Sequence, residues 1–109
     1  MLPKKHRLTY LDFLSNRNPV LRLDLILLVF NFKRSLTSGI RLVIVVPKSL
    51  DKRSVRRHMA KRIIIEAARD LIMKHQGNWD VLVKAKKILN NKDRQEVTNE
   101  ITRFLSGVR

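Results

Sequence analysis

A dense group of cations is the feature of this sequence most able to do chemistry. Its members all have long basic side chains and fall within one short stretch: Lys52, Arg53, Arg56, Arg57, Lys61 and Arg62. Such side chains bind phosphate oxygens, and arginine can hold two oxygens at once. A helix start ordinarily favours acidic residues, because its free backbone N–H groups carry partial positive charge. A single cation at this position is as often a solvated surface residue as a phosphate contact, but the clustering of six indicates a polyanionic partner.

The whole composition points the same way. Lysine and arginine number 24 against nine acidic residues, which gives a formal net charge of +15. That balance fits nucleic acid first and an anionic membrane surface second. The 44% hydrophobic content over 109 residues predicts one globular domain rather than a disordered basic tail. No apolar run approaches the ~18 residues that span a bilayer, and no signal segment follows the N-terminus, so we expect a cytoplasmic protein.

A protein active site is not expected. The absence of cysteine excludes disulfides, cysteine nucleophiles and cysteine metal ligands. The three histidines, His6, His58 and His75, do not have the spacing of metal ligands. No pair of acids resembles a general acid–base dyad, and no serine triad or phosphate-binding glycine loop is present. We therefore expect neither a catalytic residue nor a metal site in this chain.

The pattern of apolar residues predicts alternating helices and strands around these cations. Residues 1–8 are expected to form an extended basic arm, and Thr9 with Asp12 predicts the capped start of a short helix ending near Asn16. Strands are expected at 21–32, 40–46 and 80–85. Helices are expected at 52–75 and at 92–106, and the sequence Gln76-Gly77-Asn78 should stop the first of them.

The long helix carries its cations in an unusual place. In its second half an apolar stripe is formed by Ile64, Ala67, Ala68, Leu71 and Ile72. Traced back by helical turns, the same stripe carries Arg53, Arg57, Ala60 and Lys61, and charges are costly on a buried stripe. We therefore expect the first turns to extend beyond the edge of the sheet. A second apolar row, Val55, Met59 and Ile63, is expected to pin this overhang.

Three motifs in order along the chain resemble the bacterial ribonuclease P protein component. The basic helix motif of that family, R-N-R-x-x-x-R or R-N-R-I-K-R, resembles RHMAKR at 57–62. The opening LPKKHRL at 2–8, followed by Asp12-Phe13, is similar to the family's L-x-K-K-x-R-L…D-F start. WDVLVKA at 79–85 is similar to its late strand, so the resemblance covers nearly the whole chain.

The chain departs from the family pattern at several positions. His58 replaces an asparagine, and Met59 replaces the second arginine of the basic motif. Lys86 stands where the family has an arginine, which keeps the charge but loses the planar fork. Arg17 stands where a second aromatic residue often follows Asp12-Phe13. Contacts attributed to the second motif arginine are therefore either missing or supplied by Arg56.

The resemblance implies a specific fold and activity. Its members are α+β proteins, a single-domain two-layer sandwich of order α-β-β-β-α-β-α, similar to domain 2 of ribosomal protein S5, with a left-handed β-α-β crossover. They are accessory subunits of a ribozyme. The RNA subunit, with Mg²⁺ held mainly by RNA and substrate, removes the 5′ leader from precursor tRNA. Expected partners are that RNA, in a 1:1 complex with a monomeric protein, and precursor tRNA, with no membrane.

The resemblance also assigns roles to residues. Contacts to the RNA subunit are expected from the basic helix and its approach: Lys52, Arg53, Arg56, Arg57, His58, Lys61 and Arg62. Contacts to the single-stranded leader are expected in a cleft between sheet and helix: Lys4, Lys5, Arg7, Phe13, Phe30, Lys48, Lys84 and Lys86. Aromatic rings beside cations hold single strands by stacking. An aromatic residue in a strand is usually core, however, and Phe30 and Phe32 share one sheet face, so both roles stay open for them.

Two other functions fit the same residues. A structured-RNA binder associated with ribosomes would bind RNA without stimulating leader removal. A basic peripheral membrane protein would need apolar residues exposed behind a basic face. Here the apolar residues are expected in a core, which favours an RNA-binding function.

Overall fold

The structure, a computed structural model, describes residues 2–75 and 77–108. Met1 of the expected arm and Gln76 of the expected helix stop therefore lie outside the described residues. The principal elements are α1 (Tyr10–Ser15), β1 (Leu21–Asp24), β2 (Leu28–Arg34), β3 (Ile40–Val45), α2 (Ser54–Lys74), β4 (Trp79–Ala85) and α3 (Arg94–Gly107), with 3₁₀ turns at Lys4–His6 and Asn91–Asp93. The order α-β-β-β-α-β-α is the one that the family resemblance implies.

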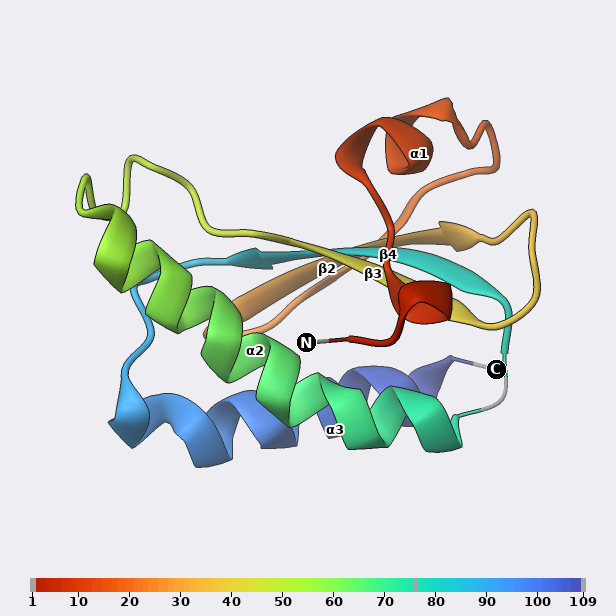
Figure 1. Cartoon of the computed structure of the whole chain (residues 1–109). Coiled ribbons are helices and arrows are strands. Elements are labelled where there is room, and N and C mark those ends of the chain that lie inside the picture. Colours follow the sequence, from red (N-terminus) through yellow and green to blue (C-terminus); the bar gives the residue numbers. More distant parts are fainter. Residues whose placement is uncertain (1, 76, 109) are drawn as a thin grey trace.

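The strands form one four-stranded sheet in the order β1-β2-β4-β3. β1, β2 and β4 are successively antiparallel, whereas β3 runs parallel to β4 and is joined to it through α2. Figure 1 shows α2 and α3 on one face of the sheet and the short α1 on the other. The α+β sandwich is thus confirmed. We call the side under α2 and α3 the core face and the other side the open face.

The first predicted strand is in fact a hairpin. The apolar run 21–32 was expected as one strand, but it turns at residues 25–27, which are all leucine or isoleucine. The Glu100 carboxylate of α3 accepts hydrogen bonds from the backbone N–H groups of Leu27 and Leu28, at 3.0–3.1 Å. The Lys86 ammonium donates to the carbonyl oxygen of Leu25 at 2.9 Å. The turn contains no glycine or proline, so it is held instead by Glu100 and Lys86, which are far from it in the sequence.

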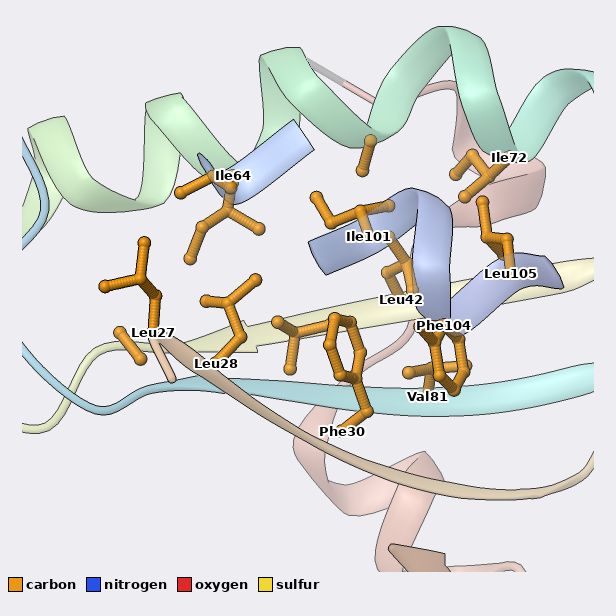
Figure 2. Close-up of a cluster of buried hydrophobic side chains, with 14 of the residues drawn as sticks. Leu27, Leu28, Phe30, Leu42, Ile64, Ile72, Val81, Ile101, Phe104 and Leu105 are labelled. Atoms are coloured by element: carbon orange, nitrogen blue, oxygen red, sulfur yellow. The ribbon is translucent and has the colours of Figure 1, made fainter. Parts of the chain in front are cut away.

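The main core lies between the sheet and the two long helices. Figure 2 shows Phe30 of β2 against Phe104 of α3, with Ile64 of α2 and Ile101 of α3 nearby. The rings of Phe30 and Phe104 stack with centroids 4.4 Å apart and an interplanar angle of 2°. The predicted stripe of α3, Val97, Ile101, Phe104 and Leu105, is buried here as expected.

The start of α2 extends beyond the sheet, as its sequence predicts. Its first buried residue is Ala60, two turns into the helix, and Figure 1 shows the preceding turns lying past the ends of the strands. The expected pin is wrong in part. Val55 is 78% exposed and Met59 is 45% exposed, whereas Ile63 is buried. Ala60 and Ile63 hold the overhang, because only they on this segment reach the core.

The N-terminal segment was expected as an extended arm but packs along β3. Leu2 and Leu8 are buried, and the ring of His6 is buried with Nδ1 2.7 Å from the carbonyl oxygen of Ile40. The N–H of Leu8 donates to Leu42 of β3 at 2.9 Å. The segment then leads into α1, whose N-cap is Thr9, as predicted. Burying the apolar residues of this segment outweighs the freedom of a solvated arm.

Candidate nucleic-acid interface

The approach to α2 contains cations that already have a partner. The Asp51 carboxylate accepts a hydrogen bond from the N–H of Arg53 at 2.8 Å. It also pairs with the side chains of Arg53 and Arg56, at 3.5 and 3.7 Å. The hydrogen bond from the Arg53 backbone, with both guanidinium groups nearby, lowers the pKa of Asp51 against a desolvation cost. Asp51 therefore partly neutralises these two arginines and orders the turn before the helix.

The next turns of α2 carry cations without such a partner. Within residues 2–75 and 77–108, no carboxylate lies within ion-pair distance of Arg57, Lys61 or Arg62. Arg57 and Lys61 are one turn apart and half-buried, and with His58 they line a hollow of about 270 Å³ at the end of β3. His58, Lys61 and Arg62 also line an outer groove of about 590 Å³ that continues to Arg69. We call this surface the α2 basic face.

A second candidate surface is a groove on the open face, between α1 and the sheet. It has a volume of about 510 Å³, and its lining is mainly apolar: Tyr10, Phe13, Leu14, Val20, Asn31, Lys33, Val45, Leu82 and Lys84. A hollow of about 420 Å³ adjoins it and shares Asn31 and Lys84. The loop at 47–50 that leads toward α2 lines this second hollow. The open face therefore offers one track from α1 to the approach of the basic helix.

Some of the residues predicted to contact the leader line the groove, whereas others are buried or bound within the protein. Phe13 and Lys84 both line the groove, but Phe13 is itself only 5% exposed, so it contributes to the apolar wall rather than a free ring face. Phe30 is 1% exposed on the core face, so its prediction as a leader contact is wrong: stacking on Phe104 excludes an RNA base. Phe32, weighed for the same role, is also buried on that face. Lys86 lines the second hollow but is bound to Asp24 and to the carbonyl of Leu25.

The remaining predicted leader residues lie elsewhere. Lys4 and Lys5 are exposed on the 3₁₀ turn beside β3, and Lys48 is exposed in the loop after that strand. The Arg7 guanidinium donates from Nε to the carbonyl oxygen of Leu2 at 2.7 Å. None of these four lines either hollow of the track. Their RNA contacts stay predictions for the rim of the molecule.

Several groove residues were missed by the sequence analysis, although signals for them existed. Asn31 and Lys33 alternate with Phe30 and Phe32 along β2, so strand periodicity places them on the opposite face. In addition, α1 has apolar residues on all sides. Leu11 is 75% exposed and Leu14 is 55% exposed, contrary to the expectation that such residues lie in the core. A short helix with more apolar surface than it can bury indicates a binding wall.

Nowhere in the described residues do three or more histidine, cysteine, aspartate or glutamate side chains form a group that could hold a metal ion. Among the same residues, no helix combines the length and apolarity that crossing a bilayer requires.

Fold and surface together define an α+β protein with a basic helix and a separate, mainly apolar groove on the open face. The family model for ribonuclease P matches residues 2–109, so the chain belongs to the ribonuclease P protein family. Its members are RNA-binding subunits of the tRNA-processing ribonuclease P holoenzyme, working with ribonuclease P RNA and a tRNA substrate. No individual curated sequence is similar enough to count as a match.

Solved structures show the same fold. The ribonuclease P protein from Thermotoga maritima is 23% identical, with a TM-score of 0.72 over 94% of this chain and 97% of that one. The protein from Staphylococcus aureus is 21% identical, with a TM-score of 0.74 over 93% of each chain. At such identities the likeness establishes the fold alone, so the roles of individual residues rest on the geometry described above.

Proposed function

We propose that this chain binds the ribonuclease P RNA through the α2 basic face and the 5′ leader of precursor tRNA through the open-face groove. The observation that carries the first part is a set of cations on consecutive turns of α2 that lie beyond ion-pair distance of every carboxylate in the described residues: Arg57, Lys61 and Arg62. Unpaired cations lose little on meeting phosphate, because no protein ion pair has to be broken first.

The groove supports the second part of the proposal. Its walls combine the exposed Tyr10 and the largely buried Phe13 with one cation, Lys84, whose side chain has no hydrogen bond or ion pair in the described part of the chain. Aromatic and apolar walls accept base faces, and a nearby cation accepts the backbone phosphate. A duplex would hide its base faces, so this lining suits a single strand such as a leader.

We further propose that the RNA performs the chemistry, with Mg²⁺ held by RNA and substrate, in the cytoplasm. Six carboxylates in the described residues lie within ion-pair distance of a basic side chain: Asp24, Asp51, Glu66, Asp70, Asp80 and Asp93. Another, that of Glu100, accepts hydrogen bonds from backbone N–H groups in the β1–β2 turn. Such acids are poorly available as metal ligands or as general bases.

The direct test is cleavage of a precursor tRNA by a bacterial ribonuclease P RNA at low Mg²⁺, with and without the protein. We expect clear stimulation, because the protein adds binding energy that Mg²⁺ alone would otherwise have to supply. Tight RNA binding without stimulation, when the cognate RNA has also been tried, would instead establish a general structured-RNA binder.

A further inference from the structure

A row of three charged residues crosses the open face beneath the end of α1. Lys33 of β2 and Arg41 of β3 are both register partners of Asp80 of β4. The Asp80 side chain is completely buried, and the Arg41 guanidinium donates to both of its oxygens, Nε to Oδ1 and Nη2 to Oδ2, each at 3.0 Å. A paired carboxylate at such depth is strongly fixed, since separating it from its partner would leave a buried charge uncompensated.

The same row holds the end of α1. The Asn16 side-chain amide donates to Oδ2 of Asp80 at 3.1 Å and to the carbonyl oxygen of Arg34 at 2.8 Å. From the other side, the Lys33 ammonium donates to the carbonyl oxygens of Phe13 and Asn16, at 2.8 and 2.9 Å. The ammonium also lies 4.4 Å from the centre of the Phe13 ring. Four hydrogen bonds therefore connect the last turn of α1 to β2 and β4.

Little else fixes α1. The helix has six residues, and Phe13 is its only buried side chain. Phe13 belongs to a small apolar cluster with Leu8 and Leu82, separate from the main core. An isolated helix of this length is unstable in water, so tertiary contacts must decide where it lies. The hydrogen bonds that Lys33 and Asp80 make to the end of α1, which we call the polar row, are directional. They therefore fix the orientation of α1 as well as its distance from the sheet.

We propose that Asn16, Asp80 and Lys33 are positioning residues that set the width of the leader groove by holding α1 above the sheet. This inference rests on the proposed function of the groove. Tyr10, Phe13 and Leu14 of α1 form one wall, so a shift of the helix changes the space between that wall and Lys84. Binding sites lose affinity when their walls move by about an ångström.

The two lysines that line the groove should have different roles. The ammonium of Lys33 is held against α1, whereas Lys84 is left for phosphate. Lys33 should therefore affect leader binding through geometry, and Lys84 should affect it through charge.

The experiment replaces Asn16 by alanine in the complex of the protein with ribonuclease P RNA. Affinity is measured for two precursor tRNAs, one with a long leader and one with a single-nucleotide leader. Asn16→Ala leaves the Arg41–Asp80 pair intact, so the sheet should still form. We expect about a tenfold loss of affinity for the long-leader substrate, comparable to losing hydrogen bonds to charged and buried groups. The short-leader substrate and the RNA subunit should bind as before.

Asn18→Ala is the matched control. Asn18 follows α1 and donates to the same Arg34 carbonyl oxygen at 2.8 Å, but it does not contact Asp80. We expect no more than about a twofold loss, since only a solvent-exposed hydrogen bond is removed. Amide hydrogen exchange should show faster exchange in α1 for Asn16→Ala, with β4 still protected.

A second variant, Lys33→Met, keeps an aliphatic stem over Phe13 but removes the hydrogen bonds to α1. We expect a leader-specific loss with an unchanged slope of affinity against salt concentration. A slope reduced by about one would show that Lys33 contacts phosphate, which would overturn its positioning role.

Failure of the groove as a leader site and failure of α1 positioning give different results. If the wild-type complex does not distinguish the two leaders, the proposed function of the groove is wrong. If the wild type distinguishes them and Asn16→Ala does so equally well, the groove binds the leader but α1 positioning by the polar row is wrong.

Discussion

The start of α2 and the groove beneath α1 both carry cations, but they use them differently. On α2, Arg57, Lys61 and Arg62 lie beyond ion-pair distance of any carboxylate in the described residues, although Glu66 attracts Arg62 at longer range, and they line a hollow and a groove. On the open face, Lys33 and Arg41 are bound within the protein, and of the two lysines that line the groove Lys84 is the one whose ammonium has no hydrogen bond or ion pair in the described residues. In the proposed function, one surface would attract phosphate by charge density, and the other would offer shape and stacking. The number of cations on a surface therefore does not predict how many bind RNA.

The largest expected effect is a difference between Phe30→Ala and Phe13→Ala, because both residues were predicted from the sequence to contact the leader. Phe30→Ala removes a ring stacked in the main core and should lower the free energy of unfolding by about 3–5 kcal/mol. Phe13→Ala should cost less stability, because its cluster is small, yet it should weaken binding of the long-leader substrate. Denaturant titration and leader affinity measure the two effects. A stable Phe30→Ala protein with weakened leader binding would reverse this assignment.

The next effect tests the α2 basic face. Arg57→Ala with Lys61→Ala should weaken binding to ribonuclease P RNA at least tenfold. It should also reduce the slope of log affinity against log salt by about two, because two phosphate contacts are lost. The matched control removes the same charge from the exposed surface near α3, as Lys92→Ala with Arg103→Ala. An equal loss in both double variants would mean that net charge, rather than this face, drives binding.

A smaller effect compares two lysines near the end of β4. Lys84→Ala should reduce long-leader affinity about threefold to tenfold, since one phosphate contact is lost. Lys86→Ala should leave leader affinity nearly unchanged, because its ammonium is held by Asp24 and Leu25. Its loss should instead loosen the β1–β2 turn, seen as faster amide exchange there. The comparison fails if Lys86→Ala weakens leader binding as much as Lys84→Ala.

The smallest effect concerns pH. The Arg94 guanidinium donates to Glu66 at 2.6 Å, and this hydrogen bond, with added attraction from nearby arginines, lowers the pKa of Glu66 against a desolvation cost. Because the pKa of Glu66 is lower in the folded than in the unfolded state, the charged Glu66 stabilises the fold at pH above its unfolded-state pKa of about 4.3. This stabilisation is lost as the pH falls through the folded-state pKa. The pair is half-exposed, so its contribution is small.

Thermal melts of the wild type and Glu66→Gln between pH 7 and about pH 2.5 would measure this. The wild type should melt slightly higher at neutral pH, and the difference should vanish in acid. A difference that persists at the lowest pH would show that Glu66 acts through packing rather than through its charge.

Much of the fold could be predicted from local pattern. The cap of α1, the apolar stripe of α3 and the overhang of α2 follow from residue spacing alone. The β1–β2 hairpin could not be predicted, because its turn is built from leucine and isoleucine and is fixed by Glu100 and Lys86 from far along the chain. The alternation of side chains along β2 is consistent with a core position for Phe30, next to Phe32 on the same sheet face. The family resemblance, in contrast, predicted that Phe30 contacts the leader.

The sequence by itself determined the charge, the helix that concentrates it and the family to which these motifs belong. Those properties depend on residues close together in the chain, where spacing translates directly into a shared helix face. Only the tertiary structure decided which cations are free. Asp80 meets Arg41 and Asn16 only after β3, β4 and α1 have packed, and Lys33 reaches α1 only across the sheet. Whether a cation binds RNA or the protein depends on neighbours that folding alone brings within reach.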